Sequence, residues 1–137
     1  MIIDATDLRL GRMATVVAKN ALLGETIDIV NCENAVLTGN RDNVLGEYKN
    51  RLKRITYKGP IVHRMPDRFV KKAIRGMLPY KQYKGDKAFK RIKCYMGVPD
   101  QFKDKKFETI KEANIANVPS LRYVYVKEIC KEIGAKI

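Results

Sequence analysis

Residues 2–30 read IIDATDLRLGRMATVVAKNALLGETIDIV, and their pattern indicates the class of fold. A pair of isoleucines opens a short apolar run typical of a strand, and apolar residues then recur at helical spacing until Gly24. Thr6 or Asp7 is a suitable cap for the start of that helix. β-branched residues return in Thr26–Val30, which predicts a second strand. Strand, helix and strand in this order favour an α/β architecture.

The alternation of strands and helices continues along the remaining chain. We expect strands at Ala35–Thr38 and Ile92–Met96, and an extended segment at Leu121–Tyr125. Helices are expected over the apolar series Val44, Leu45, Tyr48, Leu52 and Ile55, from Met65–Pro66–Asp67 to about Met77, after Asp86, and over Val126, Ile129, Cys130 and Ile133 before Gly134. At 137 residues the chain has the length of one domain with a real core. The sequence therefore predicts a single layered α/β domain with a largely parallel sheet.

The positive charge of the chain is concentrated in one segment. There are 28 Lys and Arg against 15 Asp and Glu, for a formal net charge of +13. Residues 49–93 hold sixteen of these bases and only two acids, whereas residues 1–40 are mildly acidic. A charge of this size needs a polyanion to offset it, and nucleic acid is the expected partner. Residues 49–93 are therefore the expected binding segment of the domain.

The helix expected at residues 65–77 separates apolar and basic side chains onto opposite faces. The apolar face consists of Phe69, Val70, Ala73, Ile74 and Met77. The opposite face consists of Arg68, Lys71, Lys72 and Arg75. Solvated helix faces normally mix both signs of charge, but no acid is interleaved here. We expect this face to contact a phosphate backbone, with a plain solvated face as the alternative.

A second basic cluster follows this helix and interleaves cations with aromatic rings, a composition suited to unstacked bases and bent backbones. It consists of Tyr80, Lys81, Tyr83, Lys84, Lys87, Phe89, Lys90, Arg91 and Lys93. Phe89 is better explained as a core residue than as a stacking platform, and Gly76, Pro79 and Gly85 favour a loop here. Further expected RNA contacts are Arg51, Lys53, Arg54, Lys58 and Arg64.

Residues that would indicate catalysis, a metal or a cofactor are sparse. No G-x-G-x-x-G motif follows the first strand, and there is no Walker motif. Cys32, Cys94 and Cys130 are far apart and are expected to be reduced, buried hydrophobic residues. His63 has no neighbouring nucleophile in sequence, so a structural or RNA-contacting role is expected. We expect no cofactor, no metal site, no enzyme activity, no export and no membrane span.

Several motifs resemble one known family. Residues 74–79 read IRGMLP, Gly85 follows after five further residues, and residues 92–97 read IKCYMG. Residues 10–14 and 31–40 read LGRMA and NCENAVLTGN. In these motifs and their spacing the chain resembles the L13 (uL13) family of large-subunit ribosomal proteins, in its archaeal form. Cys94 departs from the larger apolar residue usual in that strand.

The resemblance implies a three-layer α/β/α domain with a four-stranded, largely parallel sheet. It also implies a structural protein of the large ribosomal subunit that binds ribosomal RNA early in assembly and has no enzyme activity. The implied location is the ribosome in the cytoplasm, beside neighbouring large-subunit proteins, with a monomer expected when the chain is free. The individual RNA contacts are inferred from the residues and not from the resemblance.

Two other classes of function stay open at this point. One is a nucleotide-handling enzyme on a Rossmann-like sheet, which the missing phosphate motif disfavours. The other is an adaptor that binds acidic proteins. Binding measurements with ribosomal RNA, nucleotides and an acidic protein separate all three.

Overall fold

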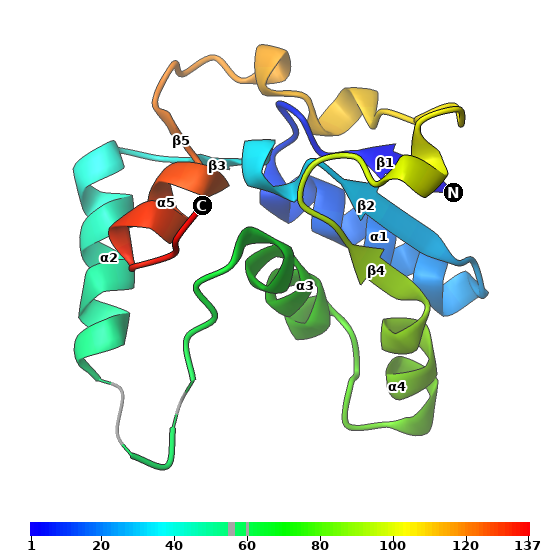
Figure 1. Ribbon diagram of the computed structural model, residues 1–137, viewed down its shortest axis with the longest axis horizontal. Coiled ribbons are helices and arrows are strands. Elements are labelled where there is room, and N and C mark those ends of the chain that lie inside the picture. Colours follow the sequence, from blue (N-terminus) through cyan, green and yellow to red (C-terminus); the bar gives the residue numbers. More distant parts are fainter. Residues whose placement is uncertain (55–56, 60) are drawn as a thin grey trace.

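The computed structural model describes residues 1–54, 57–59 and 61–137 and has a parallel sheet at its centre. The strands β1 (Ile2–Asp4), β2 (Ile27–Val30) and β4 (Ile92–Cys94) are paired in the order β1-β2-β4. Ile3 pairs with Ile29, which in turn pairs with Cys94. Figure 1 shows these strands side by side, on the side of the molecule away from α2. The mixed α/β fold expected from the strand–helix alternation is confirmed.

The expectation of four strands in one sheet is not confirmed. β3 (Val36–Thr38) forms a separate antiparallel pair with β5 (Tyr123–Tyr125), so the described parallel sheet has three strands. A 3-10 turn, Cys32–Asn34, follows β2 directly, and the chain then enters β3. Such short strands carry too few residues to specify a partner by pattern alone. The three-layer arrangement stays a prediction.

The first helix, α1 (Leu10–Leu23), has the expected extent but not the expected cap. It ends at Gly24, whose φ of 109° is a left-handed conformation suited to glycine. Its N-cap residue is Arg9, whose side chain makes no capping hydrogen bond. Thr6 donates instead to Asp4, at 2.7 Å. The prediction that Thr6 or Asp7 caps this helix is therefore wrong.

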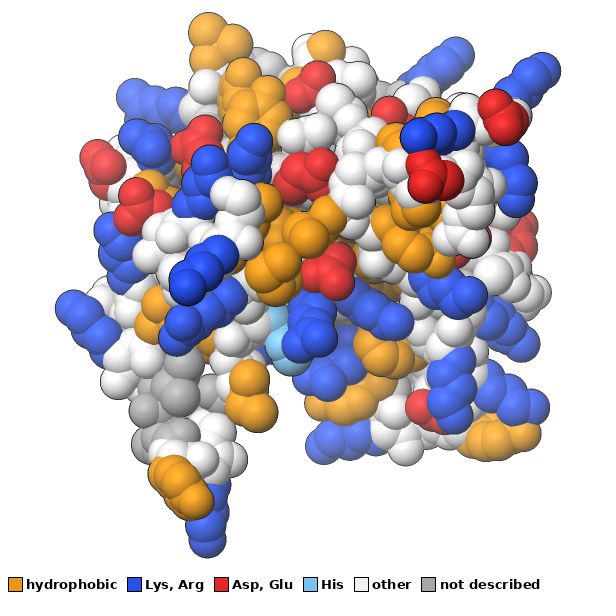
Figure 2. All heavy atoms as spheres, in the orientation of Figure 1, with side chains coloured by type: hydrophobic (Ala, Val, Ile, Leu, Met, Phe, Trp, Pro, Cys, Tyr) orange, Lys and Arg blue, Asp and Glu red, His pale blue; other side chains and the backbone are white. Residues whose placement is uncertain are grey.

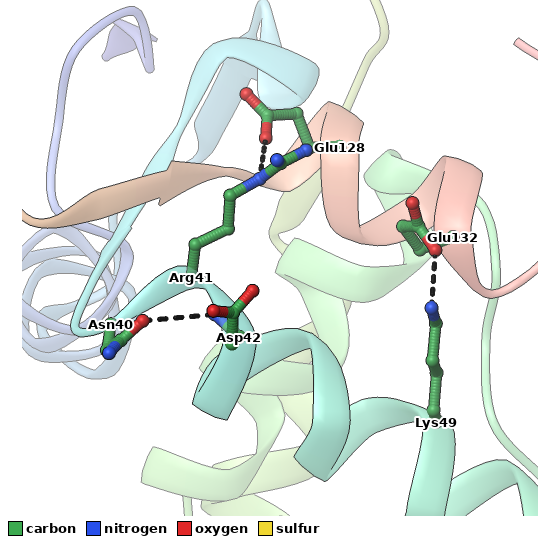
Figure 3. Close-up of polar contacts among 6 residues, drawn as sticks. All are labelled: Asn40, Arg41, Asp42, Lys49, Glu128 and Glu132. Atoms are coloured by element: carbon green, nitrogen blue, oxygen red, sulfur yellow. Dashed lines mark hydrogen bonds and ion pairs between the residues drawn. The ribbon is translucent and has the colours of Figure 1, made fainter.

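The second helix, α2 (Arg41–Lys53), is held at both ends by polar contacts (Figure 3). Oδ1 of Asn40 accepts a hydrogen bond from the backbone N–H of Asp42 at 3.2 Å and so caps the helix. Arg41 pairs with Glu128 at 3.2 Å, and Lys49 pairs with Glu132 at 2.7 Å. Both acids belong to α5 (Val126–Glu132), so two ion pairs join α2 to the last helix. Ile55, expected in the α2 series, lies outside the described residues.

The third helix, α3 (Pro66–Met77), begins with proline at its first turn, as expected. Its residues Phe69, Val70 and Ile74 are buried and belong to one hydrophobic cluster with residues of α1, β2 and α5. Met77, expected on the same apolar face, is 44% exposed. It lies in the last turn of α3, where its sulfur accepts a hydrogen bond from the hydroxyl of Thr15 at the surface.

The fourth helix, α4 (Tyr83–Lys90), begins three residues before Asp86, whereas the helix was expected to follow Asp86. Its early start converts part of the expected loop into helix. In the last helix, by contrast, Val126, Ile129 and Cys130 are buried as the apolar stripe predicts.

Two of the three cysteines are buried, and all three are free thiols. Burial raises the pKa of the Cys130 thiol to about 12. Cys94, at the edge strand β4, is only partly buried.

None of the described helices combines the length and the apolar character that a bilayer span requires.

Candidate nucleic-acid interface

The exposed face of α3 carries four cations, as the sequence predicts, and they lie together. Arg68 and Lys72 are exposed, while Lys71 and Arg75 are half-buried. Among the described residues, no carboxylate oxygen lies within 4.0 Å of any of these four charges. In Figure 1 α3 lies between α2 and α4, and Figure 2 shows Lys and Arg side chains gathered over this lower half of the molecule. The face therefore presents uncompensated positive charge to an anion.

Aromatic rings lie beneath several of the cations. The ammonium of Lys71 lies 5.0 Å from the ring centre of Phe89, and the guanidinium of Arg75 lies 5.0 Å from that of Tyr80. On α4, the ammonium of Lys87 lies 4.3 Å from the ring centre of Tyr83. Each such contact contributes about 0.5–1 kcal/mol at an exposed site and restricts a flexible side chain. The rings thus favour one position for each of these cations.

The aromatic residues of this cluster have two different environments. Phe89 is partly buried and packs against the hydrophobic core, as expected. Tyr83 is 73% exposed and Tyr80 is 43% exposed. Both tyrosines therefore retain ring surface that could stack on a base.

Some predicted contact residues pair with an acid or donate a hydrogen bond to another part of the protein. Arg51 pairs with Glu47, and Lys90 pairs with Asp86 at 2.7 Å. Nη1 of Arg91 donates to the carbonyl of Ala21 at 3.2 Å, which ties it to α1. These residues contribute less free charge to a partner than the α3 cations do.

The remaining predicted contacts lie outside α3, in the segments before and after it. Lys53 and Arg54 are exposed at the end of α2, and Lys58 is exposed in the described stretch 57–59. Arg64 extends toward Gly134, where a Cβ on the glycine would lie 3.3 Å from its guanidinium. Arg64 is thus directed toward the C-terminal segment. Lys81 is exposed just before α4, and Lys84 is exposed in its first turn.

His63 and Lys93 also lie beside the α3 cations. His63 shares a hollow with all four of them. Lys93 lines another hollow with Arg68 and Lys71. The alternation along β4 indicates this position for Lys93, because its neighbour Ile92 is buried and adjacent strand residues point to opposite faces. No sequence signal places His63, since its segment is irregular.

The segment between α3 and α4 is a hydrogen-bonded turn. The backbone N–H of Gln82 donates to the carbonyl of Pro79 at 2.9 Å. Gly85 is buried against the same carbonyl, and a Cβ at this position would lie 2.0 Å from that oxygen. The expectation that Gly85 belongs to a loop is therefore wrong: it lies in α4, where glycine is needed because two backbone segments touch.

The described residues contain no group of three or more His, Cys, Asp or Glu side chains that could hold a metal ion. The chemistry of this surface is that of positioned cations and aromatic rings. Together the fold and the surface define a small basic α/β protein with an uncompensated cationic helix face.

Comparison with known proteins identifies the family. The family model described as "Ribosomal protein L13" matches residues 1–101, which include the whole basic segment. The large ribosomal subunit protein uL13 of Methanosarcina barkeri is 44% identical, over 98% of this chain and 98% of the relative. The uL13 proteins of Methanococcoides burtonii and Archaeoglobus fulgidus are each 38% identical, over 98% and 97% of this chain and 98% and 86% of the relatives.

The chain belongs to the ribosomal protein L13 family. The resemblance stated from its motifs is confirmed, as is the archaeal character of its relatives. The family consists of ribosomal proteins and not of enzymes, so the hypothesis of a nucleotide-handling enzyme is set aside.

Proposed function

We propose that this chain is a structural constituent of the large ribosomal subunit, located in the cytoplasm, that binds large-subunit ribosomal RNA and supports early subunit assembly. Residues 1–137 act as a single L13-type domain, and residues 49–93 are its RNA-binding segment. The observation that carries the proposal is the uncompensated cationic face of α3. Neighbouring large-subunit proteins complete its surroundings in the ribosome, and the free chain is monomeric.

The mechanism is charge neutralisation at fixed positions. Lys and Arg side chains displace counterions from phosphates, which supplies affinity without reading sequence. The ring contacts of Lys71, Arg75 and Lys87 keep three of the cations in defined places. A rigid set of charges fits one folded RNA surface better than others, so the arrangement supplies specificity by shape.

The test is the salt dependence of binding to a transcribed archaeal large-subunit RNA, measured by filter binding between about 50 and 200 mM salt. With six or more phosphate contacts, the logarithm of the association constant falls linearly with the logarithm of salt, with a slope of about −5 or steeper. Small-subunit RNA is the control and binds more weakly. A flat salt response, or equal affinity for both RNAs, contradicts the proposal.

The adaptor hypothesis is tested by the same assay. An acidic protein of matched charge binds weakly compared with ribosomal RNA, because the exposed tyrosines have no bases to stack on. Equal binding of the acidic protein would favour the adaptor.

A further inference from the structure

The hollow beside α3 is formed by three parts of the chain that are separate in sequence. The segment before α3 contributes His63, α3 contributes its four cations, and α4 contributes Phe89. The cavity has a volume of about 100 Å³ and opens to the surface. Figure 2 shows the single histidine of the chain in pale blue, next to Lys and Arg side chains. The hollow is thus a concave site with cations on its walls.

The cations of the hollow are positioned by contacts that leave donors free. The ammonium of Lys72 donates one hydrogen bond to the carbonyl of Ile61, at 3.1 Å, and has two further protons to offer. Lys71 is held over Phe89 and Arg75 over Tyr80. An anion in the hollow would therefore meet several N–H donors at once, which is the arrangement that phosphate oxygens require.

We propose that this hollow takes one backbone phosphate of the bound RNA and that His63 becomes protonated when the phosphate is in place. The inference rests on the proposed RNA binding and adds a specific site and a proton to it. An imidazolium donates from both ring nitrogens, so protonation converts His63 into a further phosphate donor.

The surroundings of His63 favour the neutral ring when no anion is bound. Burial is the largest cause that lowers the pKa of His63, and the positive charges of Lys72, Arg68 and Arg75 lower it further. Asp67, at the start of α3, is the acid that acts in the opposite direction. The other charged and titratable side chains that share a hollow with His63 are Lys71 of α3 and Tyr48 and Arg51 of α2.

A phosphate in the hollow reverses this balance. Its negative charge cancels the repulsion from the three cations and favours the imidazolium, so the pKa of His63 rises on binding. RNA binding therefore takes up a proton. Affinity increases as the pH falls through the pKa of the complex and levels off below the pKa of the free protein.

The first experiment compares affinity for transcribed large-subunit RNA at about pH 5.5 and 7.5 at constant salt, near the range in which histidine titrates. If binding raises the pKa by one unit, the wild-type chain gains up to about tenfold in affinity at the lower pH. His63→Gln loses this gain, so its affinity changes less between the two pH values than that of the wild type. If both proteins bind RNA with the same pH profile, the proton-linked site is wrong while the proposed function stands. If neither binds RNA, the proposed function itself is wrong.

The second experiment uses the histidine as an internal probe, because a chain with one histidine gives one set of imidazole NMR signals. Lys72→Gln raises the pKa of His63 in the free protein, whereas Lys111→Gln, in the 3-10 turn Lys111–Ala113, leaves it unchanged. An unchanged pKa in Lys72→Gln overturns the assigned geometry.

A comparison of inorganic phosphate with RNA shows whether the hollow takes a free phosphate or a backbone phosphate. We expect inorganic phosphate at millimolar concentration to raise the pKa of His63 less than a decauridylate does at the same concentration of phosphate groups. An equal or larger effect of inorganic phosphate would overturn the assignment to an RNA phosphate and indicate a free-anion site.

Discussion

A variant that lacks the four cations of the α3 face binds large-subunit ribosomal RNA about 10³- to 10⁴-fold more weakly at roughly 0.1 M salt. The variant is Arg68→Gln, Lys71→Gln, Lys72→Gln and Arg75→Gln in one chain. At this salt concentration each phosphate contact contributes about 0.9 logarithmic unit to the association constant through counterion release, and four contacts are removed. The slope of the salt dependence, which is negative, also becomes shallower by about four. Filter binding over a salt series measures both quantities.

The matched control removes the same amount of charge outside the basic segment. It replaces four exposed lysines with glutamine: Lys105, Lys106, Lys127 and Lys136. We expect its salt slope to stay near that of the wild type. Both variants keep the wild-type circular dichroism spectrum, since none of the replaced charges pairs with an acid among the described residues. Equal losses in the two variants would mean that affinity follows net charge and not the α3 face.

The second large effect is expected at Gly85. In Gly85→Ala the new methyl group would lie 2.0 Å from the carbonyl oxygen of Pro79 and 2.9 Å from the backbone nitrogen of Tyr80. Neither atom can rotate away, because both belong to the main chain. We expect the free energy of unfolding to fall by about 1–3 kcal/mol, as for overpacked core positions. Urea unfolding of the RNA-free protein measures the change.

Gly46→Ala is the control for glycine replacement as such. Gly46 lies inside α2, and no atom within 4 Å would meet its Cβ. Alanine at a helix interior is more favourable than glycine by about 0.5–1 kcal/mol, so this variant is more stable than the wild type. If Gly85→Ala were also stabilised, the close approach of α4 to Pro79 would be wrong.

The helices were predictable from the sequence because their apolar spacing is regular. The series from Leu10 to Ala21 predicts α1, and the opposite faces of α3 follow from its sequence alone. The partners of the short strands were not predictable. Val36–Thr38 is a strand, as expected, but its pairing with Tyr123–Tyr125 depends on chain segments far apart in sequence.

The candidate site was predictable in its composition but not in its geometry. Charge counting and helical projection identify the α3 cations, since both depend only on neighbouring residues. The hollow around His63 requires knowledge of how the segment before α3 folds back onto Lys72, where Ile61 accepts its hydrogen bond. The ion pairs of Arg51 and Lys90, by contrast, connect residues four apart on one helix and are compatible with sequence spacing.

The pairing of β2 with β4 has a kinetic consequence. Ile27 and Ile92 lie side by side, and the basic segment up to Arg91 lies in the chain between them. To form this pair, the folding chain must close a long loop and bring fifteen mutually repelling cations of the basic segment into a small volume. The repulsion opposes the folding transition state and is screened by salt. Refolding from urea should therefore accelerate as salt is added. Salt has the opposite effect on RNA affinity, which it lowers. The same basic segment thus influences both the folding rate of the protein and its affinity for RNA.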